Sequence, residues 1–281
     1  MGGKARRRRA SIECRAVFTN RLPIAKLAGA VVALAAVMAA VMLSINWNGA
    51  EDSTAAPKID DLMNIMIVLS SLVFAIVVVA LAYALIAFRA KPGDESDGEP
   101  IHGNTRLEIA WTVIPTIIVL FAGGWSWKVL DEIEEPNANH MTVDVFSQQY
   151  AWSFGYPGKD YAYSQGVLHV PVNKQIVFKM HSQDVIHSFW VPQWRIKKDN
   201  VPGITTTAIV TPTKTGNYQL ICTELCGFGH SSMRAKVIVQ SQSAFDKWVE
   251  GLKEKVPTDL MVSVKQDTET NPEPLERVDA E

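Results

Sequence analysis

The sequence predicts a membrane protein made of a two-helix transmembrane hairpin, preceded by a signal or an extra helix, and a following all-β sandwich. Apolar residues gather in three early runs, and short β-rich runs alternate with turn signals over residues 139–240. We expect four divisions: a basic N-terminus with a signal or anchor helix (1–50), the hairpin (60–130), the sandwich (138–242), and a C-terminal helix with an acidic disordered tail (243–281).

Composition limits the partners. The chain of 281 residues is 48% hydrophobic and carries a formal net charge of −2. A charge so close to neutral gives no sign of nucleic-acid binding, because such binding needs a basic surface. The uneven spread of apolar residues instead points to the lipid bilayer as a partner.

The N-terminal segment combines a basic stretch with an apolar run. Residues 1–26 carry many basic residues against Glu13 alone, and the apolar residues 27–45 follow at once. About 19 residues at roughly 1.5 Å each can cross the hydrocarbon core. The pattern fits both a cleaved export signal, with a weakly supported cleavage site at residues 48–50, and a retained helix. Cys14 lies before this run, so we interpret it as an ordinary cytosolic residue rather than a lipid attachment site.

The next two apolar runs predict the hairpin. Residues 62–88 are almost free of polar side chains, and residues 109–127 end in an aromatic pair, Trp125 and Trp127. Basic residues flank the runs at the N-terminus and in the loop 89–107. The positive-inside rule therefore places that loop in the cytoplasm and everything after Lys128 outside a bacterial plasma membrane.

The sandwich is predicted from five β-rich runs and the turns between them. We expect strands at residues 141–146, 175–180, 206–210, 217–221 and 235–239. An immunoglobulin-like sandwich would place its cysteines on separate strands, whereas two of the three cysteines here share one loop. Residues 243–255 show helical spacing of apolar side chains, and the polar chain beyond residue 256 is predicted to be disordered.

The most specific pattern is a loop of metal-binding residue types. Cys222, Cys226, His230 and Met233 are separated by four, four and three positions, and His187 lies upstream. Thiolate, imidazole and thioether together favour copper over zinc. Three other interpretations compete: a disulfide between the two cysteines, a structural zinc site, and a mononuclear blue-copper site. Two copper ions bridged by both thiolates would use every ligand.

The string resembles the copper A loop of cytochrome c oxidase subunit II, since it fills every position of the pattern C-x-E-x-C-x3-H-x2-M. The resemblance implies a cupredoxin-like sandwich that holds a dinuclear copper centre. His187 and Met233 would complete one copper, and His230 with the main-chain oxygen of Glu224 would complete the other. The Glu224 carboxylate would point to a magnesium ion shared with subunit I.

Further positions are implied by the same resemblance. Glu108 matches a glutamate at the mouth of a proton pathway, although a carboxylate near a helix N-terminus also favours the helix dipole. The stretch 148–156 resembles the region in which a tryptophan accepts electrons from cytochrome c. Tyr150 stands where that tryptophan is expected, which leaves three interpretations: Tyr150 accepts the electrons, Trp152 accepts them, or these rings only pack.

The function that follows is an electron-accepting subunit of a cytochrome c oxidase. The implied partners are subunit I with its haems and catalytic copper, subunit III, and cytochrome c or another c-type donor, because the chain has no C-x-x-C-H motif of its own. Oxygen reduction to water and proton pumping would belong to the complex. The rival functions are a copper-free quinol oxidase subunit, a copper A subunit for nitric oxide reduction, and a membrane-anchored copper carrier.

Overall fold

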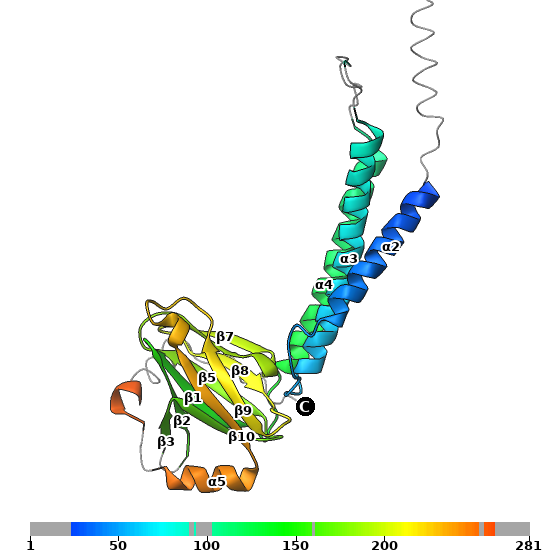
Figure 1. Ribbon diagram of the computed structural model, residues 1–281. Coiled ribbons are helices and arrows are strands. Elements are labelled where there is room, and N and C mark those ends of the chain that lie inside the picture. The colour runs from blue at the N-terminus through cyan, green and yellow to red at the C-terminus, as the bar shows by residue number, and fades with distance from the viewer. Residues whose placement is uncertain (1–23, 90–92, 94–102, 159–160, 253–255, 262–281) are drawn as a thin grey trace, which may run out of the picture. The chain divides into compact units, whose positions relative to one another are not determined.

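The computed structural model describes residues 24–89, 93, 103–158, 161–252 and 256–261 (Figure 1). The basic segment with Cys14, most of the loop 89–107 and the tail beyond residue 261 lie outside the described residues. The chain divides into two compact units. One comprises residues 1–46 and 63–118, and the other comprises residues 47–62 and 119–281.

Three long apolar helices account for the predicted runs. They are α2 (Ile24–Ser44), α3 (Ala56–Ala87) and α4 (Thr105–Ile133), and each is long and apolar enough to span a membrane. All three start earlier than the apolar runs because polar residues extend their ends. The side-chain oxygen of Asn104, for example, accepts hydrogen bonds from the backbone amides of Arg106 and Leu107 and so caps the start of α4.

The rest of the second unit is a β-sandwich of two five-stranded sheets (Figure 1). The first sheet has the order β3-β2-β1-β5-β8 and the second has the order β4-β10-β9-β6-β7. The strands of the first sheet are β1 (Met141–Gln148), β2 (Ala151–Tyr156), β3 (Ala162–Gln165), β5 (Ile176–Ser182) and β8 (Thr206–Val210). Those of the second are β4 (Val167–Pro171), β6 (His187–Val191), β7 (Ile196–Asn200), β9 (Gly216–Cys222) and β10 (Arg234–Gln240).

Alternating side chains of both sheets form the core. Val143 and Val145 of β1 face inward, as do Phe178 and Met180 of β5, and all four are fully buried. The predicted fold class is therefore confirmed, and each of the five predicted strands is present. Sequence reasoning missed the other five strands, among them β6, which carries His187.

The C-terminal helix α5 (Gln242–Gly251) is shorter than the predicted 243–255. Its cap Ser241 accepts a hydrogen bond from the amide of Ala244, and Trp248 stacks on His169 with ring centroids 3.8 Å apart. The tail predicted to be disordered lies mostly outside the described residues. Residues 258–261 form a helical turn in which Leu260 is buried.

Candidate metal centre

The topology of the second sheet brings the predicted ligands together. Cys222 ends β9, and the loop returns through a short 3-10 turn, η2 (His230–Ser232), to Met233 at the start of β10. The amide of Cys222 donates to the carbonyl of Met233 at 3.1 Å, which closes the loop. His187 begins β6, the strand that pairs with β9, so it lies close to Cys222 although the two are 35 positions apart in the sequence.

The ligand atoms form one compact cluster. The Sγ atoms of Cys222 and Cys226 are 3.8 Å apart. Nδ1 of His187 lies 3.8 Å from the first sulfur, and Nδ1 of His230 lies 3.6 Å from the second. Met233 Sδ is 3.8 Å from Cys226 Sγ, and the Glu224 carbonyl oxygen is 3.4 Å from Cys222 Sγ. Each of the other four predicted donor atoms therefore lies within 3.8 Å of one of the two cysteine sulfurs.

The spacing of the sulfurs decides between two of the alternatives. A disulfide requires about 2.05 Å between sulfur atoms, whereas the two cysteines are free and 3.8 Å apart. Metal–thiolate bonds of about 2.3 Å, as found for zinc, can reach from both sulfurs to one point on either side of the pair. The donor set of two thiolates, two imidazoles and a thioether therefore fits copper.

The site is buried and its thiols differ in acidity. Burial disfavours the thiolate of Cys222, yet hydrogen bonds with His187 and with backbone groups of Ser188 and Glu224 lower its pKa to about 6. Burial and the neighbouring charge of Cys222 raise the pKa of the Cys226 thiol to about 11. One thiol is thus ionised near neutral pH, and a bound metal would displace the proton of the other.

Asp184 fixes the orientation of His187. Its Oδ1 lies 2.8 Å from Nε2 of His187, so the opposite nitrogen, Nδ1, faces the sulfurs. Burial opposes a charge on this imidazole, but Cys222 and Asp184 together raise its pKa. Sequence reasoning did not find this role for Asp184. The signal available in the sequence was the D-x-x-H spacing, which places Asp184 three positions before the first residue of β6, His187.

Tyr150 covers the copper loop. A Cβ added at Gly229 would lie 2.5 Å from its ring, and one added at Gly227, which has φ +126°, would lie 2.7 Å from its hydroxyl. The neighbouring Gln149 donates its side-chain amide to the carbonyl of Cys226 at 2.5 Å. The two glycines therefore let an aromatic ring, 40% exposed to solvent, lie directly on the loop that holds the ligands.

Trp152 lies deeper than Tyr150. It is 1% exposed, and its ring centroid is 6.1 Å from that of His187 in an edge-to-face arrangement. Its indole N–H has no hydrogen-bond partner among the described residues. The two aromatic candidates therefore occupy different places: Tyr150 at the surface of the loop and Trp152 in the core beside a ligand.

The remaining predicted site residues lie apart from the cluster. The Glu224 side chain is exposed, while its carbonyl contacts Cys222. Glu108 lies in the first turn of α4, where its Oε1 accepts a hydrogen bond from the Asn104 amide at 3.0 Å. Together with the Asn104 cap this forms a reciprocal capping arrangement, which supports the structural role for Glu108.

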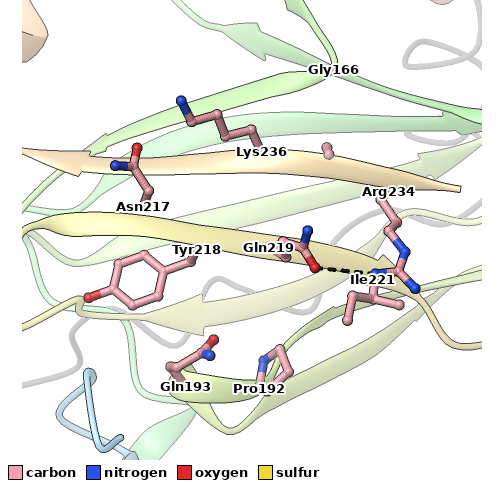
Figure 2. A pocket seen from close by; sticks show the side chains of 10 residues that line it. Gly166, Pro192, Gln193, Asn217, Tyr218, Gln219, Ile221, Arg234 and Lys236 are labelled. Atoms are coloured by element: carbon pink, nitrogen blue, oxygen red, sulfur yellow. Dashed lines mark hydrogen bonds between the residues drawn. The ribbon is translucent and has the colours of Figure 1, made fainter.

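A separate groove of about 630 Å³ lies on the second sheet (Figure 2). Polar side chains of β9 and β10 line it, and Arg234 donates to Gln219 across these strands at 3.3 Å. The lining includes none of the six ligands.

Comparison with known proteins agrees with this site. Residues 163–241 match the family described as cytochrome C oxidase subunit II, periplasmic domain, and residues 40–129 match its transmembrane domain. Cytochrome c oxidase subunit 2 of Thermostichus vulcanus is 33% identical over 249 residues, covering 70% of this chain and 75% of that protein. The chain belongs to the cytochrome c oxidase subunit II family.

Other members of this subunit II family show its breadth. A probable quinol oxidase subunit 2 of Staphylococcus haemolyticus is 30% identical over 195 residues, covering 67% of this chain and 52% of that protein. The crystallised periplasmic domain of subunit II of cytochrome oxidase from Bradyrhizobium japonicum is 30% identical, with a TM-score of 0.40, and covers 42% of this chain and 96% of that domain. The relatives thus include proteins named as cytochrome c oxidase subunits and proteins named as quinol oxidase subunits.

Proposed function

We propose that this subunit II accepts single electrons at a dinuclear copper A centre and passes them to a haem of subunit I. The observation that carries the proposal is the grouping of both imidazoles, the thioether and the Glu224 carbonyl around the two cysteine sulfurs. A quinol oxidase subunit would have no use for this ligand set. A nitric oxide reductase partner would use the same centre, and the catalytic subunit decides between the two.

Each ligand has a place in the proposed centre. Cys222 and Cys226 would bridge the two ions, His187 with Met233 would complete one, and His230 with the Glu224 carbonyl would complete the other. Bound copper would supply a one-electron centre whose charge is shared over two ions. The protein holds His187 and Cys222 on two paired strands and buries them together with Cys226 and Met233, which limits the movement that accompanies a change of charge.

Tyr150 is proposed as the residue through which electrons reach the loop. Its ring is exposed and lies on the backbone of Gly227 and Gly229, whereas Trp152 is sealed from the surface. A donor that docks over Tyr150 would be separated from the ligands by one ring and the loop itself. Trp152 would then hold the imidazole of His187 in place from the core side.

The partners follow from family membership and the exposed groups. We propose cytochrome c or another c-type cytochrome as donor, with subunits I and III as neighbours in a bacterial plasma membrane. The exposed Glu224 carboxylate is proposed as a ligand of a magnesium ion shared with subunit I. Glu108 would both cap α4 and mark the cytoplasmic mouth of a proton pathway, which is supported by its place in the first turn of that helix.

Metal analysis of the full-length chain after copper loading tests the proposal. We expect two copper ions per chain, a purple colour and a paramagnetic resonance signal from one electron shared over two coppers. Cys222→Ser should abolish this signal, while Cys14→Ser, the matched control, should leave it unchanged. One copper or one zinc per chain would contradict the dinuclear assignment.

A further inference from the structure

Arg195 occupies an unusual backbone position at the edge of the sandwich. It follows the 3-10 turn η1 (Pro192–Trp194) and adopts a left-handed conformation with φ +59°. Such a conformation costs a residue with a Cβ roughly 1 kcal/mol. Trp194 points into the core and is fully buried, so the left-handed turn sends the next side chain, that of Arg195, away from the core.

The Arg195 guanidinium binds groups within residues 48–60, which are distant from it in the sequence. It forms a two-pronged ion pair with Asp60 in the first turns of α3, at 2.8 and 2.7 Å. Its Nη1 also lies 3.0 Å from the carbonyl oxygens of Asn48 and Ala50. The side chain is only 6% exposed. A buried arginine with this many acceptors is a fixed connection rather than a surface charge.

The segment held in this way, residues 47–54, is called the strap. We call the contacts of the Arg195 guanidinium with Asp60 and with the carbonyls of Asn48 and Ala50 the clamp. The strap also forms backbone hydrogen bonds with the sandwich: the Asp52 amide donates to Gln193 O at 3.0 Å, and the Thr54 amide donates to Thr211 O at 3.1 Å. Asp52 also forms an ion pair with Lys214 at 2.8 Å. The strap leads directly into α3, so these contacts tie the copper-binding sandwich to the outer end of that helix.

We propose that Arg195 is a positioning residue for electron transfer out of the metal centre. This inference rests on the proposed function. The step moves one electron from the reduced copper pair to the oxidised haem of subunit I, with no bond made or broken. Its rate depends on where the sandwich is held relative to that haem. By anchoring the strap and Asp60, Arg195 restricts the sandwich to one position on the outer end of α3.

The test uses the assembled oxidase and compares Arg195→Gly with Lys236→Ala, an exposed basic residue of the same domain. Glycine adopts the left-handed conformation freely, so this substitution removes the guanidinium without adding backbone strain. We expect Arg195→Gly to keep two coppers with unchanged absorption and potential, and to slow copper-to-haem electron transfer at least tenfold. Arg195→Lys should restore part of the rate, and Lys236→Ala should leave it unchanged.

Hydrogen exchange of the full chain measures the strap itself. The amides of Asp52 and Thr54 should exchange at least tenfold faster in Arg195→Gly than in the parent. Asp60→Asn keeps the carbonyl acceptors of the clamp, so its strap amides should show a smaller increase in exchange rate. This variant replaces Arg195→Gly in the measurement if the glycine variant does not accumulate. The proposal would be overturned if Arg195→Gly kept the full electron-transfer rate although its strap exchanged faster, or if this variant lost copper. Unchanged amide exchange in both Arg195→Gly and Asp60→Asn would also overturn it. The exchange result stands even if the copper assignment fails.

Discussion

At the scale of single residues, the site depends on groups that never touch a metal. Asp184 orients His187 through a contact of 2.8 Å, and Gln149 holds the Cys226 carbonyl. Neither role can be derived from the metal-ligand spacing, because both depend on side chains that converge only after the sheets form. The six candidate ligands, by contrast, could be proposed from the sequence because five of them share one short loop and their chemistry restricts the choice of metal.

Asp184→Asn should weaken copper binding about tenfold to a hundredfold, as loss of an outer partner of a ligating histidine typically does. The amide can still accept one hydrogen bond, but it removes the negative charge that raises the pKa of His187. Competition with a copper chelator measures the change. Asp199→Asn is the matched control, since the Asp199 carboxylate pairs with Lys197 at 3.5 Å on the surface. Equal affinity in both variants would show that Asp184 does not support the ligand.

Gly229→Ala should destabilise the copper loop by about 1–3 kcal/mol, the usual cost of overpacking. The added methyl group would lie 2.5 Å from the Tyr150 ring, so either the ring or the loop must move. Denaturant unfolding followed by the copper absorption measures the loss. Combining it with Tyr150→Ala, which removes the ring, should recover most of the stability. A double variant no more stable than Gly229→Ala alone would place the clash elsewhere.

At the scale of elements, sequence patterns predicted five strands and missed the other five. β6 and β7 contain one β-branched residue each, against four in the predicted strand β8, although all three strands have five residues. Without β6, the sequence could not show how His187 reaches Cys222, because this strand pairs with β9 and brings the two residues together. The turn that buries Leu260 was not predicted either, because the segment 256–261 is held by contacts distant in the sequence, such as the hydrogen bond from the Val256 amide to the Tyr161 carbonyl.

Helix α5 provides a test of how firmly the C-terminal element is attached. Phe245 is 6% exposed and packs near Tyr156 and Trp248. Phe245→Ala should therefore cost about 3 kcal/mol of stability through lost burial and the cavity left behind. Denaturant unfolding of the copper-loaded chain measures it. Lys247→Ala, an exposed change on the same helix, should stay within about 0.5 kcal/mol.

At the scale of the whole molecule, family membership explains the order of the parts, and the strap explains how two of them are connected. The sequence left open whether the chain is cut at residues 48–50. In the structure these residues are bound: the carbonyls of Asn48 and Ala50 accept from Arg195, and the side-chain amide of Asn48 donates to Asp60 at 2.8 Å. Cutting after Ala50 would remove both carbonyl acceptors from a guanidinium that is almost fully buried.

We therefore expect the mature subunit to contain Asn48, with any cleavage lying closer to the N-terminus. Intact-mass measurement and N-terminal sequencing of the subunit purified from membranes decide this directly. The Arg195→Gly variant tests whether the clamp causes this protection. If the clamp shields the strap, a protease of broad specificity should cut the variant near residue 50 and leave the parent chain intact there. A mature parent chain that starts at Glu51 would contradict the expectation, because the buried guanidinium would then lack acceptors that the structure provides.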